Sequence, residues 1–322
     1  MRIALVLCLA AAPATADVSS ALTDHVLPGY AMLAQETEHL SVAAAQDCTL
    51  PSLTARFNSA YDAWVAVSHL QLGPVEDEGL LLAMSFWPDT KDRTGKALTR
   101  LTASNDPIVD DPTKFDDVSA AAQGFTALER VLYGAASDAD YTCRLTRAIA
   151  KGLAEKSDRL FAQWPDFAAL MQTAGEPGNT RFQNPQEAQR ALYTALSTGL
   201  EFMHDQRLGR PLGTFERPRP NRAEARRSER SLRHIQISLT SLEQLAFSLS
   251  DDALPKTKAA FSDARTRADT IDDPALAGVA DPISRFRIEA LQQSVREIQI
   301  AIVEEIGSPL GITAGFNALD GD

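Results

Sequence analysis

"PSLTARFNSAYDAWVAV", residues 51 to 67, places its large apolar side chains at the spacing of one helix face. Leu53, Phe57, Tyr61 and Trp64 recur every three or four residues, which is the period of an amphipathic helix. Pro51 suits the first turn of such a helix, where its missing N–H costs no hydrogen bond. The stretch therefore predicts a helix that buries one side in a core.

Three further stretches repeat this spacing, and almost no segment alternates apolar and polar residues with period two. Strands are therefore expected to be absent or trivial, and the predicted fold class is all-α. The apolar positions of the three stretches are Val118, Ala122, Phe125, Leu128 and Leu132; Leu232, Ile235, Leu239, Leu242 and Leu245; and Phe286, Leu291, Val295, Ile298 and Ile302.

Glycine and proline gather in four connections, at residues 71–79, 104–117, 173–187 and 207–221. Long helices joined by turn-rich segments predict two antiparallel helical bundles packed together. The connection at 173–187 is the best candidate boundary. We expect an N-terminal helical bundle over 17–175 and a C-terminal one over 176–322.

The first 16 residues have the pattern of a secretory signal peptide. An apolar run from Ile3 to Ala12 is followed by Pro13 and by a small-x-small ending at Ala14 to Ala16. The run is shorter than the roughly 20 residues that cross a bilayer, and no later segment reaches that length. The sequence thus predicts an exported protein without a transmembrane segment.

Removal of the signal peptide would remove Cys8 and leave two cysteines. In an oxidising compartment the simplest outcome is a Cys48–Cys143 disulfide, the alternative being two buried free thiols. Their spacing fits no zinc or redox motif. The formal net charge of −12 makes nucleic acid a poor partner.

"GFTALERVLYG", residues 124 to 134, places Glu129 within an apolar helical pattern beside Phe125 and Tyr133. A carboxylate buried there would need a cation, an arginine or a metal as partner. The alternative is a residue at the edge of the stripe that reaches water or pairs with an arginine for packing.

Other polar residues stand in apolar surroundings, and each has a structural alternative. His69 precedes the Gly73-Pro74 turn and could simply end a helix. Asp89, beside Trp87 in "SFWPD", could be a turn residue or an N-cap. In "RRSERSLRHI", residues 226 to 235, Ser228 and Ser231 suggest a polar cluster, whereas the arginines are typical of a solvated face. Common hydrolase and phosphate-binding motifs such as HExxH and GxSxG are absent, and we assign no catalytic residue.

Together these segments resemble the imelysin family, exported bacterial proteins often associated with iron uptake and once filed as metallopeptidases. The family's GxHxxE motif stands here as Gly124 to Glu129, followed by Val131-Leu132-Tyr133-Gly134. The similarity spans the mature chain. It includes "WVAVSHLQLGP", "SFWPD", "RLGRPLG", "RSERSLRHI" and the ending "GFNALDGD". The chain departs from the motif at Thr126, which replaces the histidine.

The resemblance implies a periplasmic protein with a polar site between the two bundles. We expect this site to contain His69, Trp87, Asp89, Thr126 and Glu129 from the first bundle and Arg227, Ser228 and Ser231 from the second. Glu129 and His69 are the candidate ligands of iron or another divalent metal, since threonine cannot replace imidazole in that role.

Two classes of function remain open beside a partner-docking protein without a ligand. The first is a binding or accessory protein of an iron-acquisition system, which takes a metal ion or a small ligand and works with other periplasmic iron-uptake components. The second is a metal-dependent peptidase, which the loss of the motif histidine disfavours.

Overall fold

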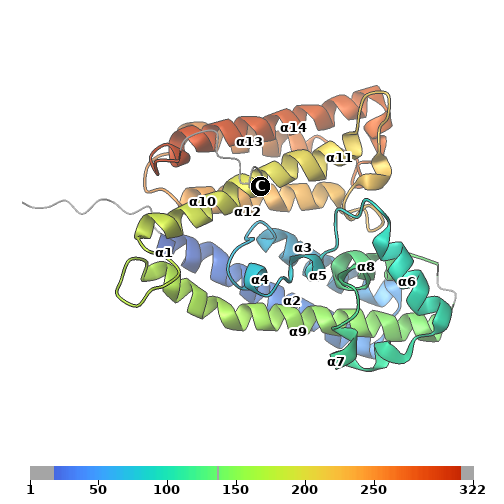
Figure 1. The fold of residues 1–322 in the computed structure, drawn as a ribbon. Helices are drawn as coiled ribbons and strands as arrows, with labels where there is room; N and C mark the ends of the chain where they lie inside the picture. The colour runs from blue at the N-terminus through green and yellow to red at the C-terminus, as the bar shows by residue number, and fades with distance from the viewer. Residues whose placement is uncertain (1–17, 136–137, 313–322) are drawn as a thin grey trace, which may run out of the picture.

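The computed structural model describes residues 18–135 and 138–312, and these residues form helices and connecting loops (Figure 1). The one β-type pairing among them is an isolated bridge between Thr214 and Arg217. The predicted all-α class, with two helical bundles packed together, is confirmed. The exact division at residue 175 stays a prediction, and the predicted signal peptide lies outside the described residues. No helix of the described part is long and apolar enough to span a membrane.

The first bundle is built on α2 (Leu27–Gln46), α3 (Leu50–Val67) and the long α9 (Ala139–Gln172), with α8 (Gly124–Leu132) packed against α9. In Figure 1 it occupies the lower half of the view. Its shorter elements are α1 (Val18–Ala21), the π-helical turn Leu22–Val26, α4 (Pro74–Asp77), α5 (Leu81–Met84), α6 (Arg93–Ser104), the 3₁₀ turn Pro107–Asp110, α7 (Pro112–Phe115) and the 3₁₀ turn Ala120–Ala122.

The second bundle contains α10 (Pro185–Phe202), α12 (Ser231–Ser248), α13 (Pro255–Asp269) and α14 (Pro282–Ile302). α12 packs against α3, so these two helices bring the bundles together. The shorter elements are the π-helical turn Met203–Leu208, α11 (Gly209–Leu212), the 3₁₀ turns Pro220–Arg222 and Ala277–Ala280, and the π-helical turn Val303–Gly307.

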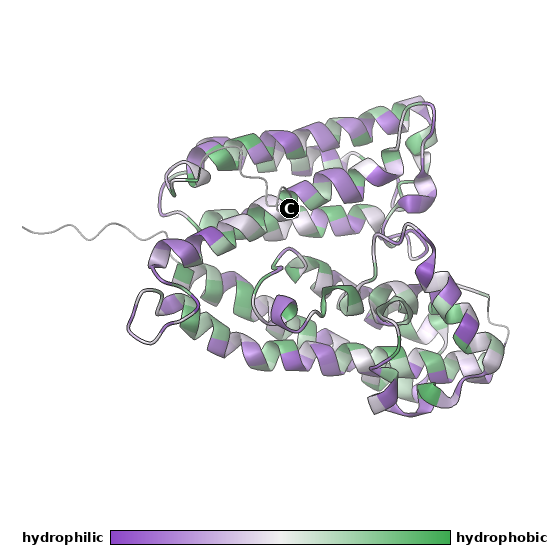
Figure 2. Cartoon of the chain, in the orientation of Figure 1, coloured by the Kyte–Doolittle hydropathy of each residue, from purple (hydrophilic) through white to green (hydrophobic). Residues whose placement is uncertain are grey.

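The predicted apolar stripes of α3 and α12 are buried as expected, and Figure 2 shows apolar and polar residues alternating around the helices. The other two stripes need correction. Gly124 begins α8, so Val118 and Ala122 precede the helix. Phe286 is 70% exposed, while Ile288 is fully buried and continues the stripe of α14 instead. Position 286 lies two residues away from 288, which places it on roughly the opposite side of the helix.

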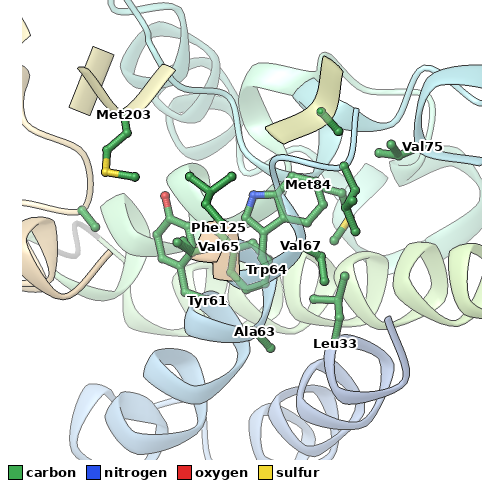
Figure 3. Packing of buried hydrophobic residues seen from close by; sticks show 14 of the residues in the cluster. Leu33, Tyr61, Ala63, Trp64, Val65, Val67, Val75, Met84, Phe125 and Met203 are labelled. Atoms are coloured by element: carbon green, nitrogen blue, oxygen red, sulfur yellow. The ribbon is translucent and has the colours of Figure 1, made fainter. Parts of the chain in front are cut away.

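The predicted disulfide between Cys48 and Cys143 is confirmed and ties the segment before α3 to α9. Deeper in the core, the rings of Tyr61 and Phe125 stack with centroids 4.7 Å apart. Both residues are among those labelled in Figure 3, and Met203 of the second bundle belongs to the same buried cluster. The apolar core thus continues from one bundle into the other.

An ion pair and a hydrogen bond reinforce this junction. The guanidinium of Arg230 contacts both carboxylate oxygens of Asp62 on α3, with Nε 3.0 Å from Oδ1. Arg207 donates to Ser68, which follows α3, at 3.3 Å. These contacts join residues more than a hundred positions apart and fix how the two bundles face one another.

Candidate functional site

α8 carries three polar side chains on one face. Thr126, Glu129 and Arg130 are spaced at i, i+3 and i+4, which brings them to the same side of the helix. Gly124 begins the helix with φ 73°, and a Cβ there would lie 2.4 Å from the carbonyl oxygens of Ala83 and Met84. Only glycine therefore permits this close approach of α8 to α5.

Glu129 is 3% exposed and bonds to the second bundle. Its Oε1 accepts hydrogen bonds from the backbone N–H of Ser228 at 2.9 Å and from the Ser228 hydroxyl at 2.8 Å. The Ser228 hydroxyl also lies 3.1 Å from the carbonyl oxygen of Ala225. The carboxylate that the sequence places in an apolar helix is thus held by a loop of the facing bundle.

A cavity of about 70 Å³ lies beside Glu129, and we call it the arginine cavity. Both bundles contribute to it. Its lining residues are Trp87, Asp89, Thr126, Glu129, Arg130, Arg210, Asn221, Arg222, Ala223, Ala225, Arg226 and Arg227. Five of the predicted site residues therefore line one cavity, and a sixth, Ser228, binds Glu129 at its edge.

Asp89 is held by the start of α6. Its carboxylate accepts the backbone N–H groups of Arg93 at 2.9 Å and Thr94 at 2.8 Å. Burial acts to raise the pKa of Asp89, but these backbone hydrogen bonds outweigh it and the pKa is lowered. Arg130 lies 3.8 Å from the same carboxylate and also pairs with Asp92. Asp89 thus binds the first N–H groups of α6, as the N-cap alternative describes, and it also lies near Arg130.

Thr126, at the position of the motif histidine, begins a chain of hydroxyl groups that leads away from the cavity. Its Oγ1 lies 3.1 Å from the Ser85 hydroxyl, which lies 3.2 Å from the hydroxyl of Tyr61. Burial, followed by the negative charges of Glu224 and Glu129, raises the pKa of Tyr61. The phenol therefore remains protonated at neutral pH and can serve as a donor in this chain.

His69 lies elsewhere, in a smaller cavity with Ser68, Phe202, Arg207 and Ser238 among its lining residues. Its Nε2 is 2.9 Å from Nε2 of His25. Burial, the neighbouring His25 and the charge of Arg207 lower the pKa of His69. His69 lines this cavity and Glu129 lines the arginine cavity, so the two candidate metal ligands do not share a cavity.

Ser231 also points away from the arginine cavity. Its hydroxyl donates to the carbonyl oxygen of Glu224 at 2.5 Å and lies 3.3 Å from that of Ala275. It therefore fixes the segment before α12 and does not face Glu129.

A buried ionic network lies next to this segment and was not predicted from the sequence. Nε of Arg207 donates to Glu224 at 2.7 Å, and a second nitrogen donates to Ser238 at 2.7 Å. Nδ1 of His234 lies 3.2 Å from the same Glu224 oxygen. Burial acts to raise the pKa of Glu224, but Arg207 and His234 lower it to about 2. The signal available in sequence was only a set of polar residues at helical spacing.

The donor groups fit a bare metal ion poorly. Among the described residues, no three histidine, cysteine, aspartate or glutamate side chains meet in a group that could hold a metal. Glu129 already accepts two hydrogen bonds, and five arginines line its cavity. A divalent cation would meet electrostatic repulsion there.

A second cavity, of about 300 Å³, adjoins the first. The two share Arg130 and Arg227. Leu98, Val131 and Leu145 give the second cavity apolar surface, while Thr99, Thr102 and Thr142 add hydroxyl-bearing side chains. Together the cavities offer a charged compartment beside a larger mixed one.

Comparisons with known proteins agree on the family. The family model described as Imelysin matches residues 26–302. The structure is similar to an imelysin-like protein from Psychrobacter arcticum 273-4, with TM-score 0.77, 19% identity and coverage of 93% of this chain and 96% of the other. An iron-regulated protein A precursor from Parabacteroides distasonis ATCC 8503 gives TM-score 0.72, 13% identity and coverage of 92% and 93%. Curated protein sequences gave no significant match.

Proposed function

The chain belongs to the imelysin family, and from that premise we propose that it is a periplasmic binding protein of an iron-acquisition system. It takes a small ligand into the arginine cavity, where the two bundles meet. The role in iron acquisition is supported by the family and by the similarity to a protein described as iron-regulated. The predicted signal peptide supports the location.

One observation carries the proposal. The contact between Glu129 and Ser228 lies at the edge of a cavity whose lining comes from both bundles. Ligand sites commonly lie at such junctions, where a few polar groups converge from separate elements. A carboxylate that only satisfied local packing would not require an adjoining cavity. This cavity has eleven further lining residues, and they come from both bundles.

Growth of a deletion strain under iron limitation tests the role. We expect slower growth than the parent when iron is chelated, recovery with added iron, and rescue by the wild-type gene. Arg227→Gln, in the cavity, should rescue poorly although the protein is present at normal abundance. The exposed Arg287→Gln is the matched control and should rescue fully. A deletion strain that grows like its parent in chelated medium would exclude the role in iron acquisition.

A further inference from the structure

The arginine cavity is strongly positive on a protein that is negative overall. Five guanidinium groups line it, against the carboxylates of Asp89 and Glu129, while the whole sequence carries a net charge of −12. The arginines come from α8, from α11 and from the segment between α11 and α12. They are Arg130, Arg210, Arg222, Arg226 and Arg227.

Most of the hydrogen-bonding capacity of these arginines is unused. Arg222, which is exposed, and Arg226 and Arg227, which are half-buried, make no side-chain hydrogen bond or ion pair with any described residue. Nε of Arg130 and Nε of Arg210 are buried without an acceptor. A guanidinium has five N–H donors, and a buried donor without a partner is costly. The cavity therefore presents donors that lack acceptors.

The arginines also repel one another. Burial, followed by the positive charges of Arg130 and Arg226, lowers the pKa of Arg227. Burial and Arg222 likewise lower the pKa of Arg210. Such groups remain protonated at neutral pH, so the repulsion persists until a counter-charge enters.

The two carboxylates of the cavity do not supply that counter-charge in full. Asp89 is engaged by the start of α6, and Arg130 is the arginine nearest to it. Oε1 of Glu129 is engaged by Ser228. Even with Asp92, which pairs with Arg130, three carboxylates face five guanidinium groups, so positive charge remains in excess. An oxygen-bearing anion would balance the excess positive charge and would also accept hydrogen bonds from the free donors.

We propose that the arginine cavity binds an anion through carboxylate or other oxyanion groups, so that iron reaches this protein as an anionic chelate and not as the free ion. The planar fork of arginine matches a carboxylate or phosphate with two parallel hydrogen bonds. This inference rests on the proposed function, because it names the ligand class of the same cavity.

The sizes of the cavities limit how such a ligand sits. About 70 Å³ accommodates one small oxyanion group. The larger neighbouring cavity, which shares Arg130 and Arg227, accommodates the rest of a larger ligand. An anion with several carboxylates, such as citrate alone or as its ferric complex, has this combination of charge and size.

Calorimetric titration tests the inference, with citrate, ferric citrate and inorganic phosphate as anions and with ferrous and calcium chlorides as cations. We expect citrate or ferric citrate to bind, and the chlorides not to. Arg227→Gln and Arg222→Gln should each weaken anion binding by about tenfold or more, as loss of a charge-assisted contact predicts. The control Arg287→Gln, on the exposed side of α14, should bind like the wild type.

Two more measurements separate binding from folding. Without anion, Arg227→Gln should melt no lower than the wild type, because the substitution relieves repulsion and breaks no ion pair. Glu129→Gln should bind the anion as tightly or more tightly, since it removes a negative charge, whereas a cation site would be weakened. Binding of phosphate, but of neither citrate nor ferric citrate, would keep an oxyanion site in the cavity and overturn the iron chelate as its ligand.

The outcomes that would overturn the inference differ from those that would overturn the proposed function. One such outcome is binding of the metal chlorides that is weakened by Glu129→Gln and unaffected by the arginine substitutions. That result would refute anion binding and keep a ligand-binding role. Equal weakening of anion binding by Arg287→Gln and Arg227→Gln would show nonspecific attraction and refute the inference. No binding of any anion or cation would refute both.

Discussion

Ser228 holds the carboxylate of Glu129 with both its backbone N–H and its hydroxyl, across 99 positions of sequence and across the junction of the two bundles. Hydrogen bonds to a charged acceptor are stronger than neutral ones, and this acceptor is almost fully buried. The pair therefore both orients Glu129 beside the arginine cavity and connects the bundles.

Ser228→Ala should lower the free energy of unfolding by about 1.5 to 3 kcal/mol, since it removes one hydrogen bond to a charged group and keeps the backbone one. Chemical denaturation measures the effect. Ser104→Ala is the control, because the Ser104 hydroxyl is exposed and bonds only within α6. Equal stability of the two variants would mean that the hydroxyl of Ser228 adds nothing to the junction.

Mature protein, without the predicted signal peptide and its Cys8, should contain no free thiol, because Cys48 and Cys143 are bonded to each other. Replacing both cysteines by serine should cost about 4 to 5 kcal/mol in the chain-entropy model for a loop of this length. Thiol titration of unfolded, unreduced protein and denaturation of the double variant provide the measurements. Two titratable thiols in the wild type would contradict the bond.

The carboxylate of Glu224 should stabilise the folded protein by an amount that varies with pH in the acid range. Its pKa is about 2 in the folded protein against an ordinary value of 4.5, so the contribution is complete above about pH 4.5 and is lost as pH falls toward 2. Glu224→Gln leaves Arg207 buried without a counter-charge and should cost about 3 to 5 kcal/mol at neutral pH.

Denaturation of wild type and Glu224→Gln across this pH range checks the assignment. The difference in stability between the two proteins should narrow as pH falls from 4.5 to 2. A difference that stays constant would show that the carboxylate has the same pKa in the folded and unfolded chains.

His25 should make the fold sensitive to mildly acidic pH. Burial lowers its pKa to about 4 from 6.5, so the unfolded chain binds a proton between these values and the folded chain does not. Stability is therefore complete above about pH 6.5 and declines as pH falls toward 4, by about 3 kcal/mol at most.

The variant His25→Gln should flatten this part of the stability curve, while His39→Gln, on the surface of α2, serves as the control. His69 and Gln244 contact His25, so His69→Gln should alter the same region. A wild-type curve that is flat between pH 4 and 6.5 would argue against a buried neutral imidazole pair.

The helical fold followed from the sequence because burial of one helix face leaves a regular spacing of apolar residues. The prediction of buried residues failed where the spacing of apolar residues was only approximate. The size and apolar character of Phe286 predict that it belongs to the buried stripe of α14, yet Ile288 and Leu291 are the residues buried there. Likewise, α8 begins at Gly124, and the residues before it belong to another segment. The spacing of apolar residues across Gly124 does not reveal this break.

The candidate site was harder to predict because its residues meet through tertiary contacts. Glu129 and Asp89 stood out as carboxylates among apolar neighbours. The arginines at 210, 222 and 226 did not, since a run of arginines is also typical of a solvated surface. His69 is an isolated imidazole in the sequence, but its partner in the structure is His25, and no local pattern relates residues 44 positions apart.

The disulfide encloses one side of the arginine cavity and leaves the other side outside its loop. Trp87, Asp89, Thr126, Glu129 and Arg130 all lie between Cys48 and Cys143, whereas the remaining lining residues follow position 209. Because a chain is synthesised from its N-terminus, both cysteines and all five of these residues emerge before any residue of the opposite side. One disulfide can thus enclose the segment that supplies the first side of the cavity before the residues of the other side have emerged.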